Sequence, residues 1–197
     1  HGEKPHWGYT GEGSAERWGE LAPEYRLCAI GTRQTPIDIP QGSATPDPGA
    51  VTFTNYAKIP LRVFTNGHTV QENYASAFGE ADPQVSYGGK SYFLVQLHYH
   101  TPSEHQVDGA GHAMELHLVH KQMNDKAAPL LVVGVFLDMG AAQAALGDML
   151  NRVPKESWSE RDACEGEVDL GALLPAKRSF FAYTGSLTTP PCSVGVQ

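Results

Sequence analysis

Two stretches of the chain alternate between apolar and polar side chains with a period of two. In residues 93–100 one face carries Phe93, Val95, Leu97 and Tyr99, and the other carries Leu94, Gln96, His98 and His100. In residues 114–120 one face carries Glu115, His117 and Val119, and the other carries Met114, Leu116, Leu118 and His120. This alternation is typical of β-strands. Turn residues lie between the stretches at Asp108, Gly109 and Gly111, so we predict a loose antiparallel hairpin.

The first of these two strands is predicted to span residues 91–100, and similar patterns predict further strands at residues 51–56, 60–65, 69–74, 84–87 and 179–183. Residues 130–137 are apolar on both faces, which predicts a central buried strand. Residues 141–150 favour a short helix, whereas residues 153–176 are expected to be mostly irregular. The segment up to about residue 35 lacks a clean period, and we expect its aromatic residues to hold it on the core: Trp7, Tyr9, Trp18 and Tyr25. The sequence therefore predicts a mainly β protein with minor helices.

Composition narrows the functional classes. A length of 197 residues suits one domain, and 41% hydrophobic residues with 21 Gly and 14 Pro suit a chain rich in strands and turns. The net charge is −8 and no long basic run occurs, which argues against nucleic acid as a partner. No apolar stretch reaches the ~20 residues of a transmembrane helix, so no membrane span is expected.

Three histidines have the spacing of a metal site. His98 and His100 lie two residues apart on one strand face, so their side chains leave the backbone about 7 Å apart. His117 on the paired strand supplies a third imidazole. Three nitrogen ligands leave one tetrahedral position open, as in a catalytic rather than a structural zinc site.

Two further polar residues share the face of these histidines. Gln96 precedes His98 by two residues, and Glu115 precedes His117 by two. A metal-bound imidazole donates its second N–H to such an acceptor, which fixes its orientation. The competing interpretation is a set of solvent-facing polar positions on half-exposed strands. Because the histidines and both acceptors are in phase, the metal interpretation is favoured.

A second metal interpretation is also open. The spacing His98-x-His100-x-x-x-Glu104, followed by a later histidine, resembles the metal motif of the cupin barrels. Glu104 would then be a ligand, and iron or manganese would be favoured over zinc. The histidine pair alone does not separate the two interpretations.

A downstream motif favours the zinc interpretation. Residues 185–192 read Gly-Ser-Leu-Thr-Thr-Pro-Pro-Cys, a segment with no role in the cupins. Together with the segments 7–9, 34–39, 66–68, 103–105 and 115–120, it closely resembles the α-class carbonic anhydrases of the exported bacterial type. The motifs follow the family's order from residue 6 to residue 195, which is nearly the whole chain.

The resemblance implies a fold and an activity. The expected fold is a single domain over residues 1–197 with a large, mostly antiparallel central sheet, short peripheral helices and long loops. The expected activity is the reversible hydration of carbon dioxide to bicarbonate and a proton through zinc-bound hydroxide. The Zn2+ cofactor would be held by His98, His100 and His117, with Gln96 and Glu115 as acceptors for two of the rings.

The resemblance also assigns further residues. Thr188 would orient the hydroxide and donate its own proton to Glu104, which makes Glu104 an orienting residue rather than a ligand, and His68 would be the proton shuttle. The carbon dioxide pocket would be lined by Val119, Val132, Leu187 and Thr189. The cavity wall and its water network would include Tyr9, Asn66 and Gln71. The remaining histidines are expected to be structural hydrogen-bonding residues (His105, His120) or solvent-exposed (His1, His6, His112), with His6 near the cavity rim.

The resemblance pairs Cys28 with Cys192 in a disulfide and leaves Cys164 as a free thiol. We therefore expect a mature periplasmic or secreted chain from which a signal peptide has been removed. Expected ligands are carbon dioxide, bicarbonate, sulfonamides and inhibitory anions, and analogy with bacterial members suggests a homodimer.

The chain ends at Gln197, earlier than is usual in this family. The usual C-terminal segment supplies a backbone carbonyl that supports the middle ligand, here His100. If the chain truly ends at Gln197, we expect weak zinc retention and poor activity. The alternative function is then a non-catalytic relative that binds zinc or a protein partner.

Overall fold

The computed structural model describes residues 5–46, 49–65, 68–122, 129–153 and 164–197. Its strands are β1 (Asp38–Ile39), β2 (Thr52–Thr54), β3 (Lys58–Thr65), β4 (Val70–Asn73), β5 (Gln84–Tyr87), β6 (Lys90–His100), β7 (Gln106–Val107), β8 (Ala110–Gly111), β9 (Met114–Lys121), β10 (Leu131–Leu137), β11 (Cys164–Asp169), β12 (Gly185–Ser186) and β13 (Val194–Val196). Its helices are α1 (Trp18–Leu21), α2 (Leu27–Ile30), α3 (Ala144–Leu150) and α4 (Leu170–Leu173), with single 3-10 turns at Gly11–Gly13, Ala15–Arg17, Pro23–Tyr25 and Gln41–Ser43.

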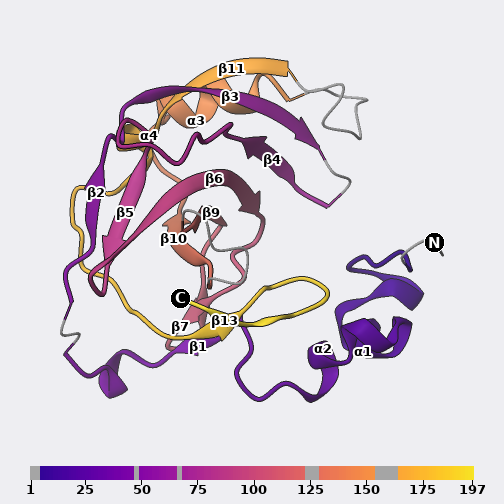
Figure 1. The fold of residues 1–197 in the computed structure, drawn as a ribbon. Coiled ribbons are helices and arrows are strands. Elements are labelled where there is room, and N and C mark those ends of the chain that lie inside the picture. The colour runs from indigo at the N-terminus through magenta and orange to yellow at the C-terminus, as the bar shows by residue number, and fades with distance from the viewer. Residues whose placement is uncertain (1–4, 47–48, 66–67, 123–128, 154–163) are drawn as a thin grey trace.

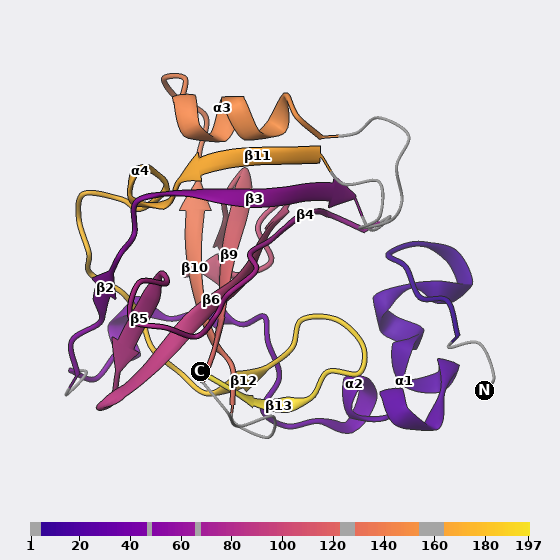
Figure 2. The ribbon, with the colours of Figure 1, turned by 45° about the horizontal axis from the view of Figure 1, so that its top comes forward.

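An antiparallel sheet of eight strands dominates the fold, as the resemblance implied. Its main path runs β10-β9-β6-β4-β3-β11, and β5 joins β2 to the start of β6. The predicted hairpin between residues 93–100 and 114–120 is confirmed, because β6 and β9 pair antiparallel with His98 opposite His117. Figures 1 and 2 show the sheet strongly curved, with α3 beside β11 and the N-terminal helices α1 and α2 at the opposite side of the molecule.

The two faces of the sheet differ in chemistry. One face packs into the main hydrophobic core, where Leu97 and Leu116 have no exposed surface and α3 and α4 contribute Leu146 and Leu170. The other face carries Gln96 and the three histidines of the motif and lines a cavity. The alternation in β6 and β9 therefore separates the core from the candidate site.

Strict alternation in β6 fails at one position. The register with β9 shifts between Leu94 and Gln96, so Val95 is an extra residue in a β-bulge. Leu94 consequently packs in the same core as Leu97, and the prediction that it shares the face of the histidines is wrong. Downstream of the bulge the predicted faces hold.

The strand β10 forms within one residue of its predicted bounds, but its predicted place is wrong. It ends the described sheet, with β9 as its one strand partner there, rather than lying in the centre. Near the start of this strand, the backbone N–H of Val132 donates a hydrogen bond of 2.8 Å to the carbonyl oxygen of Gln197. The strand is apolar on both faces because Val133 packs against the core while neighbouring Val132 lines the cavity.

Three further expectations are wrong. Residues 164–173, expected to be irregular, form β11 and α4, and β11 pairs along its whole length with Lys58 to Val63 of β3. Residues 179–183, expected to be a strand, have no regular structure, and Phe180 and Phe181 are exposed. The N-terminal segment is helical in short turns rather than irregular, although Trp18 and Tyr25 are buried as expected. In the described part of the chain, no helix has the length and apolar character needed to cross a membrane.

Candidate metal centre

The pairing of β6 with β9 brings the three histidines together. His98 lies directly opposite His117, and His100 follows two residues along the same face. Their candidate ligand nitrogens all lie within 4.8 Å of one another. The three side chains are half-buried or buried, so the cluster lies at the floor of a cavity and not on the surface.

Each ring keeps one nitrogen that points at its neighbours. His98 uses Nδ1 for a 2.8 Å hydrogen bond with Gln96, and His117 uses Nε2 for a 2.8 Å hydrogen bond with Glu115. The other nitrogens, His98 Nε2 and His117 Nδ1, are 3.3 Å apart. His100 Nε2 is buried and has no hydrogen-bond partner within the described residues. An orphaned buried nitrogen beside two converging ones fits a metal ion with imidazole ligands.

Burial also sets the charge of the cluster. Desolvation, with the repulsion between neighbouring imidazoles, lowers the pKa of His98 to about 3 and that of His100 to about 4. Both rings are therefore neutral at physiological pH, and their lone pairs are available to a metal. The donor set thus fits a divalent ion of zinc type, whereas a cluster of protonated histidines would repel one.

Glu115 supports the histidine cluster through hydrogen bonds. Burial alone would raise the pKa of its carboxyl, but hydrogen bonds from His105 and His117 and from the backbone N–H of His105 hold it well below the usual range. Its Oε2 accepts from the backbone N–H groups of Glu104 at 3.0 Å and His105 at 2.9 Å. Gly134 lies opposite His117 on β10, and a Cβ there would come within 3.0 Å of Glu115 Oε1. A larger residue at Gly134 would therefore displace this carboxylate.

Sequence reasoning missed the residues that continue this network. His105 Nδ1 lies 2.7 Å from Glu115, and His105 Nε2 lies 2.6 Å from the hydroxyl of Tyr183. That hydroxyl donates to Thr35 at 3.1 Å, and Thr35 also accepts from the backbone N–H of Ser186 at 2.9 Å. The expectation that His105 is a hydrogen-bonding residue agrees with these contacts. Tyr183 gave no signal, and Thr35 lies in the motif segment 34–39 but was assigned no role, because each is far from the histidines in sequence.

Glu104 lies beside the cluster without belonging to it. Its Oε1 is 3.4 Å from His100 Nδ1, and its buried Oε2 has no hydrogen-bond partner in the described structure. Burial raises the pKa of this carboxyl, opposed by the charge of His117 and by a hydrogen bond from the side chain of Thr188. Glu104 and Thr188 therefore interact, which is the contact that the resemblance implied.

A cavity of about 810 Å³ opens above the cluster. It brings together the described residues expected in the substrate pocket and the polar wall, which are Val119, Val132, Leu187, Thr189, Tyr9 and Gln71. Asn66 lies outside the described residues. His68 also lines the cavity, and its ring stacks on Trp7 with the ring centroids 3.8 Å apart. This stack was not predicted from the sequence.

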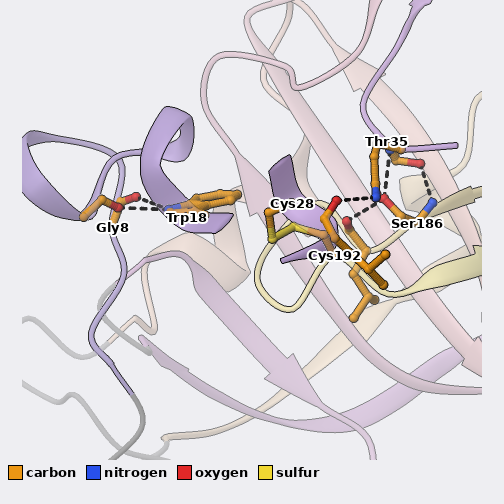
Figure 3. Close-up of a disulfide and its surroundings, with 10 residues drawn as sticks. Gly8, Trp18, Cys28, Thr35, Ser186 and Cys192 are labelled. Atoms are coloured by element: carbon orange, nitrogen blue, oxygen red, sulfur yellow. Dashed lines mark hydrogen bonds between the residues drawn. A yellow bond between two sulfur atoms is a disulfide. The ribbon is translucent and has the colours of Figure 1, made fainter. Parts of the chain in front are cut away.

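A disulfide fixes the loop that carries Thr188 and Thr189. Cys28 of α2 and Cys192 are bonded across 164 residues of sequence, as the resemblance implied. The backbone N–H of Cys192 donates to Thr189 at 2.9 Å. Figure 3 shows the bridge between the N-terminal helices and this loop, with the mutual hydrogen bonds of Thr35 and Ser186 beside it. The loop is thus held at two points close to the cavity.

Comparisons with known proteins agree with this geometry. The family model described as eukaryotic-type carbonic anhydrase matches residues 13–197. A curated carbonic anhydrase of Nostoc sp. is 39% identical over 196 residues, covering 96% of this chain and 70% of the relative. One from Neisseria gonorrhoeae is 36% identical, covering 100% of this chain and 73% of the relative.

A solved structure gives the same result. The α-carbonic anhydrase of Thermovibrio ammonificans, in complex with the inhibitor sulfanilamide, superposes with a TM-score of 0.82 at 35% identity, covering 98% of this chain and 82% of that one. The match therefore extends over the sheet, the histidine cluster and the disulfide-linked loop. On these grounds the chain belongs to the eukaryotic-type, or alpha, carbonic anhydrase family.

Proposed function

We propose that this chain catalyses the reversible hydration of carbon dioxide to bicarbonate and a proton, with a zinc ion held by His98, His100 and His117. The observation that carries the proposal is the convergence of three imidazoles, each with one nitrogen directed at the others. When bound, zinc supplies Lewis acidity that makes water a nucleophile at neutral pH.

The residues behind the ligands fix their tautomers. Gln96 accepts from His98 Nδ1–H, which leaves Nε2 for the metal, and Glu115 accepts from His117 Nε2–H, which leaves Nδ1. His100 contributes Nε2. A cupin-type site with Glu104 as a ligand is not favoured, because Glu104 interacts with Thr188.

Thr188 and Glu104 orient the nucleophile. An ionised Glu104 accepts the hydroxyl proton of Thr188, so the Thr188 oxygen is left as an acceptor and selects one orientation of the attacking group. Carbon dioxide is apolar and needs an apolar surface beside the metal, and we assign this surface to Val119, Val132 and Leu187.

We assign removal of the product proton to residues of the cavity wall. Hydration releases one proton for each carbon dioxide, and we assign its removal to His68, whose unperturbed pKa near 6.5 suits transfer at neutral pH. Burial, with the nearby charge of His6, lowers the pKa of His68 further. Tyr9, Asn66, Gln71 and Thr189 are proposed to hold the water network between His68 and the cavity floor.

The surroundings support two further proposals. The chain belongs to a family whose Thermovibrio ammonificans member was solved in complex with sulfanilamide, so we propose that this chain binds sulfonamides and small anions in the cavity above the histidine cluster. The Cys28–Cys192 disulfide suggests an oxidising compartment, which supports the periplasm or the cell exterior.

The test combines metal analysis with stopped-flow hydration of carbon dioxide. The parent chain is expected to bind about one zinc ion and to be active, and His117→Ala is expected to lose zinc and at least ~100-fold in activity. His112→Ala is the matched control, because His112 lines the same cavity but bonds to Asp138 and stacks on Phe136. Hydration unaffected by His117→Ala contradicts the proposal. Retained iron or manganese supports a cupin-type site, and zinc binding without hydration supports a non-catalytic relative.

A further inference from the structure

One side-chain hydroxyl binds the backbone between two of the clustered histidines. Thr69 immediately precedes β4 and lines the cavity. Its Oγ1 donates to the carbonyl oxygen of Tyr99 and accepts from the backbone N–H of Tyr99 at 3.3 Å. Tyr99 is the residue between His98 and His100. We propose that Thr69 is a positioning residue, which fixes the backbone between these two ligands and so raises the affinity of the site for zinc. The inference rests on the proposed function, because it takes the histidines to be zinc ligands.

The hydroxyl of Thr69 continues the pairing of β4 with β6 beyond the point where the described backbone register ends. That register ends with Gln71 opposite His98, and Tyr99 is the next residue of β6. Tyr99 is 6% exposed, and buried backbone groups need hydrogen-bond partners. A hydroxyl is both donor and acceptor, so one side chain serves the N–H and the C=O of the same residue. The carbonyl of Val70, at 3.3 Å, is a second acceptor within reach of this hydroxyl.

Of the three ligands, His100 depends most on this backbone support. The rings of His98 and His117 are each oriented by a 2.8 Å hydrogen bond to an acceptor behind them. His100 Nδ1 has a longer contact, 3.4 Å from Glu104 Oε1. The pairing of β6 with β9 continues to His100, so its backbone is held on that side. On the β4 side the preceding residue is held by Thr69. Loss of the hydroxyl is therefore expected to act on the zinc site mainly through His100.

The first experiment measures the dissociation constant for zinc by competition with a chromophoric chelator. Thr69→Val keeps the shape of the side chain but removes the hydroxyl, and we expect zinc affinity to fall about 10-fold. Thr69→Ser keeps the hydroxyl and is expected to bind zinc as the parent does. Thr52→Val is the matched control, because Thr52 makes the same chemical change possible on β2 of the same sheet, where its side chain is exposed. It is expected to keep the parent affinity.

The second experiment does not depend on activity or on the strength of zinc binding. Hydrogen exchange of the backbone amides is followed by NMR with zinc in excess over each protein. In Thr69→Val the Tyr99 N–H loses its acceptor, and we expect its exchange to become about 10-fold faster. The amides of β11 are expected to exchange as in the parent, whereas a general loss of stability would accelerate them too. Thr69→Ser is expected to protect the Tyr99 amide as the parent does.

The outcomes separate the positioning role from the proposed function. Parent-like zinc affinity in Thr69→Val, or an equal loss of affinity in Thr69→Ser, overturns the positioning role while the proposed function stands. If Thr69→Val does not fold, Thr69→Ala removes the hydroxyl without adding a methyl group and takes its place in both measurements. A parent that binds zinc without hydrating carbon dioxide overturns the proposed function, and the expected loss in Thr69→Val then still supports the positioning role. Absence of zinc binding in the parent overturns both.

Discussion

Glu115 on β9 and Glu72 on β4 are equally buried, since each side chain belongs to a residue that is 1% exposed. Their surroundings are opposite in kind. Glu115 lies on the cavity face and accepts hydrogen bonds from two histidines and two backbone N–H groups, which hold its pKa well below the usual range. Glu72 lies on the core face, and its two oxygens have no hydrogen-bond partner in the described structure.

The pKa of Glu72 moves in the other direction. Its cross-strand neighbours are Val63 and Leu97, and burial raises its pKa to about 8, while the nearby hydroxyl of Tyr99 opposes the shift. Glu72 is therefore a neutral acid at pH 7, and Glu115 is a carboxylate. The charge of a buried acid is therefore decided by the donors around it and not by the depth of burial.

The largest expected effect is at Glu115. The variant Glu115→Ala leaves donors of His105 and His117 and two backbone N–H groups without their acceptor, and we expect the free energy of unfolding to fall by about 3–5 kcal/mol. Zinc affinity is expected to fall about 10- to 100-fold. Urea unfolding and metal titration measure the two losses. Glu167→Ala is the control, because Glu167 is exposed and pairs only at the surface with Lys58; a parent-like Glu115→Ala would refute the role of the network.

The next effect is at Glu72, and it depends on pH. Because the folded-state pKa is raised above the unfolded value of 4.5, the stability that this acid contributes is full below about pH 4.5 and is lost as the pH rises through about 8. The variant Glu72→Gln does not titrate there, so at pH 9 it is expected to exceed the parent in unfolding free energy by about 2–4 kcal/mol. Urea unfolding from pH 5 to pH 9 tests this, and parallel curves for the two proteins would contradict it.

The smallest effect is at the far end of the Glu115 network. The variant Tyr183→Phe keeps the ring but removes the hydroxyl that joins His105 to Thr35, so we expect a loss of about 1 kcal/mol. A double-mutant cycle with Thr35→Val measures the coupling, expected to be at least ~0.5 kcal/mol because the two side chains share one hydrogen bond. Additive effects of the two substitutions would show that the network ends at Tyr183.

The strands whose residues alternate regularly between apolar and polar were predicted from the sequence. The strand β5 has its predicted bounds, and β6 and β9 differ from theirs by one residue at one end. The strand β11 was missed because Gly166 occupies one of its inward positions, so Val168 is the one buried side chain among those described in this strand. Residues 179–183 were mistaken for a strand because their aromatic side chains suit a sheet, although none of the strands that the structure describes pairs with them.

The residues of the candidate site also divide into those that a local sequence pattern predicts and those that it does not. The common face of Gln96, His98 and His117 follows from a period of two and is visible in the sequence. Tyr183 and Thr35 were not predicted, because Tyr183 is 78 residues from His105 and 148 from Thr35, and no local pattern joins such positions. The buried, unpartnered state of Glu72 was also not predicted. Alternation shows which residues share a face of the strand, but it does not show whether that face meets the core or the cavity.

The strand β6 changes its pairing partner at the bulge formed by Val95. Upstream of it Phe93 pairs with Gln84 of β5, and downstream of it Gln96 pairs with Asn73 of β4. A shift of one residue reverses the face of every side chain that follows. Loss of the Val95 codon would remove the extra residue and leave Leu94 and Gln96 consecutive opposite His120 and Val119, so the pairing with β5 and the histidines would both keep their faces. Active descendants of this chain should accordingly tolerate deletion of Val95, whereas an inserted residue beside it would put the histidines out of phase with the β5 pairing.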